Sequence, residues 1–262
     1  MTFTDQVVWI TGASTGIGEA LALEFARQGA QLVLSARNVP ALRRVQAACA
    51  PAQALVVPVD LTDAASLPAA VEVVLTHYGR LDMLVNNAGL SQRSLAAETT
   101  LAVDRQLMEV NYFGTVALTK AVLPHLVRQG SGRLVVVSSL VGKFGTPYRS
   151  AYAASKHALH GFFDSLRAEL TDTGLEVTII CPGFIRTSIS VNALTGDGAP
   201  LGTMDEATNR GMAATVFARH ALRAVAKGRN EVYIGGRETM GVLLKRLAPG
   251  LFARLLTKAK VR

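Results

Sequence analysis

A tyrosine and a lysine that could transfer a proton lie four residues apart, in Tyr152-Ala-Ala-Ser-Lys156. On a helix, residues at this spacing share one face, so the ammonium can lie beside the phenol. A phenol titrates near pH ~10 in isolation, and a nearby cation favours its anion. Tyr152 could then donate or accept a proton near neutral pH. The same spacing is also typical of an exposed helix face, so the residues elsewhere in the chain decide its interpretation.

A glycine-rich turn, Thr11-Gly12-Ala13-Ser14-Thr15-Gly16-Ile17-Gly18, lies between an apolar run and a helical pattern. Glycines let the backbone approach a pyrophosphate, which the free N–H groups and the dipole of the following helix can bind. The turn predicts a dinucleotide site. A purely structural glycine turn after a strand is the alternative.

The elements that position these residues alternate between short apolar runs and helical patterns. The runs are continuously apolar, which is typical of parallel strands covered by helices on both faces. The sequence therefore predicts an α/β fold, a single-domain, doubly wound Rossmann-type sheet of about seven strands. Strands are expected at Val7–Ile10, Gln31–Ser35, Ala54–Val59, Met83–Val85, Leu134–Val137, Val177–Ile180 and Glu231–Ile234. Helices are expected at about 17–28, 40–49, 64–77, 100–129, 152–173 and 212–227.

The chain of 262 residues divides into a catalytic domain over 1–239, with an aperiodic loop at about 188–209, and a basic amphipathic extension over 240–262. No run approaches the roughly 18 apolar residues of a membrane span. No basic region, apolar stretch and cleavage site occur in series near residue 1, so we expect no secretory signal. Cys49, Cys181 and the histidines show no metal-site or redox spacing. We expect a cytoplasmic compartment, reduced thiols and no metal.

The cofactor preference is predicted from Leu34-Ser35-Ala36-Arg37-Asn38, at the end of the second expected strand. A site selective for NAD places an acidic residue here for the ribose hydroxyls, whereas Ala36 and Arg37 suit a 2′-phosphate. We expect NADP(H), with a solvated arginine as the alternative. Asp60-Leu61, after the third strand, could bind the adenine amino group, although Asp60 could equally cap the next helix.

Over residues 5–235 the chain resembles the classical short-chain dehydrogenases/reductases. The resemblance is carried by the ordered set of the glycine-rich turn, Asn86-Asn87-Ala88-Gly89, Asn111, Ser139 thirteen residues before Tyr152, Tyr152 with Lys156, and Pro182-Gly183. Within the family, Ser138–Lys143 and Gly161–Asp164 are similar to the branch that contains the microsomal hydroxysteroid dehydrogenases and their orphan relatives.

The resemblance implies that Ser139 binds the substrate oxygen and Tyr152 transfers its proton. Lys156 would lower the phenol pKa and bind the nicotinamide ribose, and Asn111 would hold a water that connects Lys156 to solvent. Ser138 is the competing serine, and Tyr148 could line the pocket. Ile185 and Thr187 would contact the nicotinamide carboxamide, and Thr187 could also cap the next helix. The implied cofactor-binding residues are Gly12, Ser14, Thr15, Gly16, Ile17, Gly18, Arg37, Asp60, Leu61, Asn87, Ala88, Gly89, Tyr152, Lys156, Pro182, Gly183, Ile185 and Thr187.

The implied activity is the NADP-dependent interconversion of a ketone or aldehyde with its alcohol. The substrate would contact Leu90–Leu95, Leu140–Ser150 and 188–209. These segments are apolar or small and polar, and the first two carry few charges, which indicates a lipophilic substrate. A 3-oxoacyl thioester reductase is an alternative within the family. A non-catalytic dinucleotide-sensing regulator is the alternative from another class, although such proteins typically lose the tyrosine or the lysine.

Residues 219–262 carry a net charge of +9 and residues 1–218 one of −1, so the C-terminal part accounts for the net charge of +8. No nucleic-acid-binding motif accompanies this charge, so no nucleic-acid partner is expected. In Met240–Arg262, Pro249-Gly250 separates two expected amphipathic helices, which could form a lid, a subunit contact or an interfacial membrane anchor. Their leucines and basic residues are Leu243, Leu247, Leu251, Leu255, Lys245, Arg246, Arg254 and Lys258. The resemblance also implies a homodimer or homotetramer through helices 100–129 and 152–173. The apolar residues assigned to that contact include Leu118, Val122, Phe162, Phe163 and Leu166.

Overall fold

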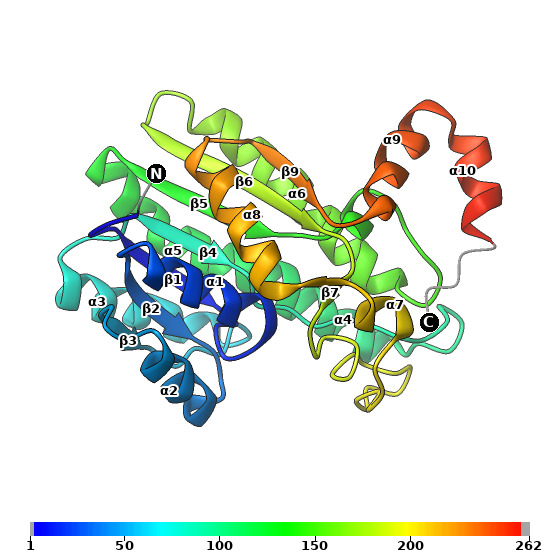
Figure 1. Ribbon diagram of the computed structural model, residues 1–262, viewed down its shortest axis with the longest axis horizontal. Helices are drawn as coiled ribbons and strands as arrows, with labels where there is room; N and C mark the ends of the chain where they lie inside the picture. Colours follow the sequence, from blue (N-terminus) through cyan, green and yellow to red (C-terminus); the bar gives the residue numbers. More distant parts are fainter. Residues whose placement is uncertain (1–2, 258–262) are drawn as a thin grey trace.

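The structure is a computed structural model and describes residues 3–257. Within this range, seven parallel strands form one sheet in the order β3-β2-β1-β4-β5-β6-β9 (Figure 1). The strands are β1 (Val7–Thr11), β2 (Gln31–Ser35), β3 (Ala54–Val56), β4 (Met83–Asn86), β5 (Gly132–Val137), β6 (Leu175–Pro182) and β9 (Glu231–Ile234). The predicted Rossmann-type sheet is therefore confirmed. A small second sheet of β7 (Ile185–Arg186) and β8 (Met212–Ala213) was not predicted.

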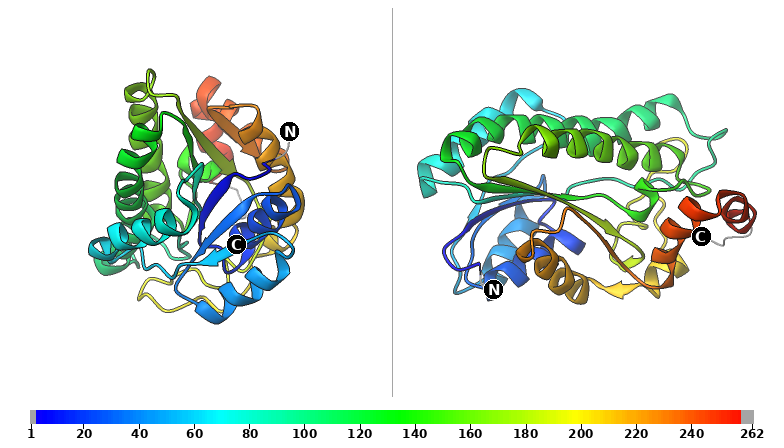
Figure 2. Two further views of the ribbon diagram at one scale, coloured as in Figure 1. Left: turned by 90° about the vertical axis from the view of Figure 1, so that its left-hand side faces the viewer. Right: turned by 90° about the horizontal axis from the view of Figure 1, so that it is seen from above.

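Helices cover both faces of the sheet (Figure 2, right). One face carries α1 (Gly16–Arg27), α2 (Val39–Ala48) and α8 (Ala214–Ala226), and the other carries α3 (Leu67–Tyr78), α5 (Gly114–Gln129) and α6 (Ser150–Glu169). In β1, Val8 and Ile10 pack on the first face, whereas Val7 and Trp9 pack on the second. Because both sets are buried, the strand is apolar at every position rather than at alternate ones.

The expected helix 100–129 is interrupted in the structure. It comprises α4 (Leu101–Met108), a π-helical turn at Glu109–Phe113 and α5. A π-helical turn accommodates one extra residue and often occurs at functional sites. Here it contains Asn111, one of the predicted site residues. The apolar periodicity of the sequence runs across the turn and gives no sign of it.

The C-terminal extension forms α9 (Met240–Leu247) and α10 (Pro249–Leu256), which break at Ala248 and project from one end of the sheet (Figures 1 and 2). The extension is attached through Phe252, whose ring packs edge-on against Phe144 at 5.1 Å between centroids. The leucines expected on its apolar face are exposed: Leu243, Leu247, Leu251 and Leu255. Lys258 lies outside the described residues. Within residues 3–257, no helix combines the length and apolarity needed to cross a bilayer.

Candidate active site

A cleft of about 620 Å³ opens at the carboxyl ends of the strands, where the strand order reverses between β1 and β4. Ligands of open α/β sheets bind at such switch points. Of the catalytic and cofactor-binding residues predicted from the sequence, Gly18 and Asn111 do not line the cleft, and the others do. The sheet topology thus brings predicted residues as far apart in sequence as Gly12 and Thr187 into one cleft.

The glycine-rich turn forms one wall of the cleft, and two of its glycines have no substitute. Gly12 has a φ of +63°, and a Cβ there would lie 2.8 Å from Ala88 Cα. A Cβ on Gly18 would lie 2.2 Å from the carbonyl oxygen of Gly12. Gly18 therefore acts from behind the cleft, by letting α1 approach β1. No side chain caps the start of α1, so its first N–H groups are available to an anion. The turn fits a pyrophosphate.

Asn87 and Thr11 hold the turn against the end of β4. The Thr11 hydroxyl accepts hydrogen bonds from the backbone N–H groups of Asn87 and Ala88, at 3.0 and 3.1 Å. Asn87 Nδ2 donates to the carbonyl oxygen of Thr11 at 2.9 Å. These bonds fix the spacing between the two strand ends, where a dinucleotide would cross the sheet.

Arg37 lies at the end of β2 with its side chain exposed toward the cleft, and no residue in the described part of the chain forms an ion pair with it. A second basic residue, Arg44 on α2, was not predicted. Its Nη2 donates to the carbonyl oxygen of Ser14 at 3.2 Å, and its guanidinium pairs with Glu19. Arg44 does not line the cleft, and its charge is paired with that of Glu19, so Arg37 is left as the basic residue that lines this end of the cleft.

Asp60 adopts a different local role from the helix cap that the sequence left open. Its Oδ1 accepts hydrogen bonds from the backbone N–H and the hydroxyl of Thr62, at 2.9 and 2.8 Å. These bonds, chiefly the one from the Thr62 backbone, lower the pKa of Asp60. The short 3₁₀ helix that follows begins at Ala64, so Asp60 does not cap it. Its carboxylate remains at the cleft wall.

Ser139, Tyr152 and Lys156 meet at the inner end of the cleft. Tyr152 and Lys156 lie one turn apart on α6, with Lys156 Nζ 5.9 Å from the centre of the phenol ring. Ser139 follows β5 and is hydrogen-bonded to the phenol. Lys156 Nζ also donates to the carbonyl oxygen of Val137 at 3.0 Å. The tyrosine and the lysine are buried, so both have lost most of their contact with bulk water.

Burial dominates the acid–base properties of this group. It raises the pKa of Tyr152, and a hydrogen bond with Ser139 and the charges of Arg93 and Arg149 oppose that rise. Burial lowers the pKa of Lys156 to about 8. The sequence prediction assigned the lowering of the phenol pKa to Lys156. In the structure, the two arginines and the serine act in this direction, although burial keeps the pKa of Tyr152 above its usual value.

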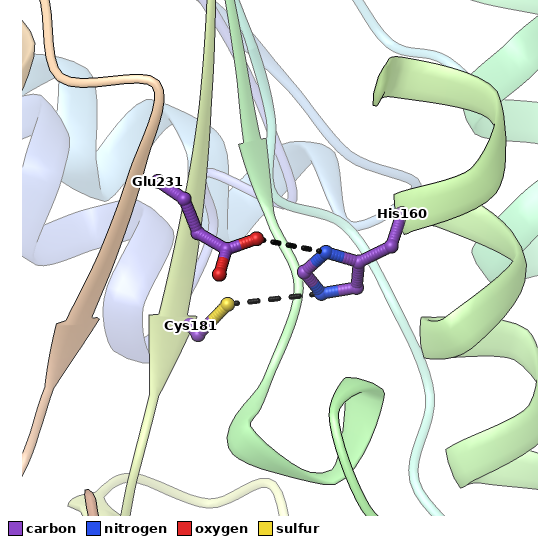
Figure 3. A group of neighbouring side chains, drawn as sticks. All are labelled: His160, Cys181 and Glu231. Atoms are coloured by element: carbon purple, nitrogen blue, oxygen red, sulfur yellow. Dashed lines mark hydrogen bonds and ion pairs between the residues drawn. The ribbon is translucent and has the colours of Figure 1, made fainter. Parts of the chain in front are cut away.

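Ser138 also borders the cleft, but its hydroxyl is engaged in a cluster of polar side chains. Its hydroxyl lies 3.1 Å from His160 Nε2. His160 Nδ1 lies 3.3 Å from Glu231 Oε2 (Figure 3). Cys181 Sγ is 3.7 Å from His160 Nε2, and the Lys143 ammonium is 2.8 Å from Glu231. Because an ammonium already neutralises the carboxylate and the imidazole nitrogens face different partners, the cluster suits a hydrogen-bonded network better than a metal. Ser139 is left as the hydroxyl that faces the cleft.

Asn111 is fully buried behind the reacting group. Its Nδ2 donates to the Leu90 carbonyl oxygen at 3.0 Å and to Ser155 Oγ at 2.9 Å, and its Oδ1 accepts from the Leu90 N–H at 2.8 Å. Both amide protons are therefore used. A water bound by this side chain, as the resemblance implies, would have to donate to it.

The far wall of the cleft comes from the segments expected to contact the substrate. It combines apolar residues with two buried arginines, Arg93 and Arg149. Tyr148, expected at this wall, is not among the described residues that line the cleft. Thr187 does line it, and its hydroxyl accepts from the Ile189 N–H at 3.4 Å. The next helix, α7 (Glu206–Asn209), begins after Asp205, so the alternative that Thr187 caps it is wrong.

Four residues at or behind this wall were not singled out in the sequence. Gln92 is fully buried, and its Oε1 accepts from the backbone N–H groups of Ala151 and Tyr152, at 2.9 and 3.3 Å. Arg93 and Asp205 form a buried ion pair across 112 positions of sequence. No local pattern indicates these contacts. Arg149 lies only three residues before Tyr152, so its proximity in the sequence could have indicated it.

Comparison with known proteins agrees with this geometry. Residues 6–197 match the family described as short chain dehydrogenase. A Mus musculus protein named dehydrogenase/reductase SDR family member 7B is 44% identical over 259 residues, which are 96% of this chain and 80% of that protein. A Drosophila melanogaster protein named dehydrogenase/reductase SDR family protein 7-like is 42% identical over 264 residues, covering 98% and 81%.

Solved structures agree as well. A short-chain dehydrogenase from Streptomyces avermitilis is 31% identical, with a TM-score of 0.84 over 97% of this chain and 96% of that one. A short-chain dehydrogenase/reductase from Burkholderia phymatum, solved in complex with NAD, has the same TM-score over 96% of both chains at 24% identity. At that identity, the second likeness supports the fold alone.

Proposed function

The chain belongs to the short-chain dehydrogenase family of oxidoreductases, and from that premise we propose that it is an NADP-dependent enzyme that interconverts a lipophilic ketone or aldehyde with its alcohol. One observation carries the proposal: Ser139, Tyr152 and Lys156 converge at the inner end of a cleft whose outer part fits a dinucleotide. A sensing regulator would have no use for a buried phenol beside a hydroxyl and an ammonium.

The nicotinamide cofactor, when bound, supplies or accepts a hydride at the substrate carbon. The Ser139 hydroxyl would donate a hydrogen bond to the substrate oxygen. Tyr152 would give its proton to that oxygen during reduction and take it back during oxidation. Lys156 would bind the nicotinamide ribose, since its ammonium lies on the same face of α6 as the phenol.

Oxidation of NADPH against a panel of carbonyl compounds tests the proposal. The panel should contain steroids, retinals, quinones, aromatic ketones and 3-oxoacyl thioesters. We expect turnover with a lipophilic ketone or aldehyde, because Leu90, Val110, Ile189 and Leu194 line the substrate end. Turnover confined to the thioesters would favour the acyl reductase alternative, and no turnover with any class would contradict the proposed activity.

The cofactor preference rests on Arg37. We expect NADPH to bind at least ten-fold more tightly than NADH, a difference of about 1.4 kcal/mol that one charge-assisted phosphate contact can supply. Arg37→Ala should remove most of this preference, as measured by quenching of protein fluorescence with each cofactor. Arg43→Ala is the matched control, since Arg43 is exposed on α2 and bonds to Gln46. Equal wild-type affinities would mean that Arg37 is a solvated surface residue.

We further propose a homodimer or homotetramer formed by the outer face of α5 and α6. Four residues that the sequence assigned to this contact, Leu118, Val122, Phe163 and Leu166, are in fact buried within the subunit. Phe113 replaces them as the anchor, with 52% of its surface exposed. Phe113→Asp should shift the light-scattering mass at micromolar concentration to that of a monomer. A wild-type monomer at that concentration would refute the assembly.

We also propose that the protein is cytoplasmic and binds membrane surfaces peripherally through α9 and α10. Four of their leucines are 50–73% exposed, with basic residues between them: Leu243, Leu247, Leu251 and Leu255. Each basic residue near an anionic surface adds up to about 1 kcal/mol to the apolar contribution. No described residue of the extension lines the cleft, which argues against a lid.

Sedimentation with anionic vesicles tests this location. The full chain should sediment at low salt and be released as salt rises, because part of the binding energy is electrostatic. The double variant Leu247→Ser, Leu251→Ser should remain in the supernatant. Leu101→Ser, an equally exposed position on α4, should behave as wild type. If the wild type does not sediment, the exposed leucines of α9 and α10 would instead be assigned to a subunit contact.

A further inference from the structure

A buried ion cluster lies beside the proposed catalytic tyrosine and joins three separate segments. Arg93 follows β4, Arg149 precedes α6, and Asp205 belongs to the substrate loop before α7. Arg93 Nε and Nη2 both donate to Asp205 Oδ2, at 2.7 and 2.5 Å, and Arg149 Nη2 lies 3.4 Å from the same oxygen. We call Arg93, Arg149 and Asp205 the arginine–aspartate cluster. All three residues are at most 5% exposed.

Neighbouring groups hold the cluster in one geometry. Arg93 Nη1 donates to Ser91 Oγ at 2.8 Å and to the Gln92 carbonyl oxygen at 2.7 Å. The backbone N–H of Asp205 donates to Ser190 Oγ at 3.3 Å. Taking three charges out of water costs several kcal/mol per ion, which apolar side chains of similar volume would not incur. A link that only fastened the loop to the catalytic segment would not need charge, so a role for the charge itself is indicated.

The cluster faces Tyr152. Both arginines line the cleft together with the tyrosine, and Arg149 lies three positions before the tyrosine, at the residue that precedes α6. Two other polar groups that face the phenol come from other elements, Arg93 after β4 and Ser139 after β5. Lys156 faces it from α6 itself. Asp205 is the acidic member of this surrounding.

We propose that Arg93 and Arg149 are positioning residues that direct permanent positive charge at the Tyr152 hydroxyl, and that Asp205 orients them and offsets part of that charge. This inference rests on the proposed function, in which Tyr152 transfers the proton. It assigns the electrostatic task to residues outside the Ser139, Tyr152 and Lys156 group.

The titration of Lys156 explains why permanent charge matters. Burial lowers the pKa of Lys156 to about 8, so its ammonium is lost as the pH rises above that value. Burial also lowers the pKa of Arg149, but only to about 10. The arginines therefore still favour the phenolate at alkaline pH, where Lys156 has become neutral and alcohol oxidation requires Tyr152 to accept a proton.

The direction of the change in the pKa of Tyr152 distinguishes an electrostatic role of the arginine–aspartate cluster from a purely structural one. The pKa of Tyr152 is measured as the ultraviolet difference titration between each protein and the same protein carrying Tyr152→Phe. Arg149→Gln should raise this pKa by about one unit or more, because an opposite charge nearby favours the anion. Asp205→Asn should lower it, because the arginine charge is then less offset. Glu206→Gln is the matched control, since Glu206 is exposed and pairs with Arg210, and it should cause no shift.

Shifts of the two variants in the same direction, or an unchanged pKa in Asp205→Asn, would overturn the proposal. Arg149→Lys should keep the pKa close to that of wild type, because it keeps the charge. If Arg149→Gln does not fold, the direction of the Asp205→Asn shift alone decides. The titration does not require turnover, so failure of the cluster proposal can be distinguished from failure of the proposed function. An active Tyr152→Phe would contradict the catalytic role of Tyr152, whatever the titration shows.

The same prediction applies to turnover. In the oxidation direction, the pH at which kcat rises should move upward in Arg149→Gln and downward in Asp205→Asn. A shift of one unit corresponds to about ten-fold in kcat on the rising limb. Loss of kcat at all pH values without a shift of the profile would show that the cluster is structural only.

Discussion

Replacing Tyr152 with phenylalanine should abolish turnover while leaving cofactor affinity nearly unchanged. The substitution removes the hydroxyl and keeps the ring, so the packing of the buried side chain is preserved. Loss of a proton-transfer group costs about 100- to 10,000-fold in rate. We expect kcat to fall by about a thousand-fold, and the Kd of the cofactor, measured by fluorescence quenching, to change by less than about three-fold.

A second tyrosine supplies the control. Tyr112 lies in the π-helical turn, and its ring contacts Phe113 and Phe162 edge-on. Tyr112→Phe should therefore retain near wild-type turnover. If Tyr152→Phe kept more than a few per cent of the wild-type kcat, another group would have to transfer the proton. If both the wild type and Tyr152→Phe bind the cofactor normally and neither turns over a substrate, the sensing regulator would be favoured.

The strands could be predicted because consecutive residues of a central strand are all buried and therefore apolar. Val7, Val8, Trp9 and Ile10 are all at most 1% exposed, so their continuous apolarity reflects the two helix layers directly. The end of β3 was harder to predict. The strand ends at Val56 rather than Val59, although the N–H groups of Val57 and Val59 still bond to the carbonyl oxygens of Leu34 and Ala36, at 3.1 and 3.4 Å. Pro58 lies between them on the edge strand, where its missing N–H would point away from β2.

The site was predictable only where its spacing is local. Tyr152 and Lys156 are one helical turn apart, and the glycines lie in one turn, so the residue types at those intervals suffice. Arg44 reaches the carbonyl oxygen of Ser14 from thirty positions away, and Arg93 meets Asp205 across 112. Such contacts depend on where the loops and helices cross, which local patterns do not specify. The sequence interpretation therefore treated the substrate end as nearly uncharged, although two arginines line it.

The buried ammonium of Lys156 lowers the free energy of unfolding at neutral pH. Its pKa of about 8 lies below the usual lysine value of 10.5, because burial disfavours the ammonium. Below pH 8 the lysine is charged in both the folded and the unfolded chain, and the folded state bears the full cost. Between about pH 8 and 10.5 the unfolded chain binds more protons, so this group makes the free energy of unfolding rise with pH.

Lys156→Met should therefore stabilise the protein at neutral pH while it damages function. Removing the buried charge gains at most about 3 kcal/mol, and losing the hydrogen bond to the Val137 carbonyl oxygen costs about 1 kcal/mol. We expect the free energy of unfolding in urea to be about 2 kcal/mol higher than wild type at pH 7. The difference should shrink as the pH approaches 10, where the wild-type lysine is neutral as well.

The functional loss should affect binding and rate together, because the ammonium has two proposed tasks. We expect kcat to fall by about 100-fold and the Kd of the cofactor to rise, since the ribose contact is lost. Lys120→Met on α5 is the control, because Lys120 is exposed and its loss should leave the pH dependence of unfolding unchanged. A stability difference between Lys156→Met and wild type that stays constant from pH 7 to 10 would contradict the lowered pKa. A loss of rate with intact cofactor affinity would remove the ribose role from Lys156 and leave it only the electrostatic one, beside two arginines that already supply charge.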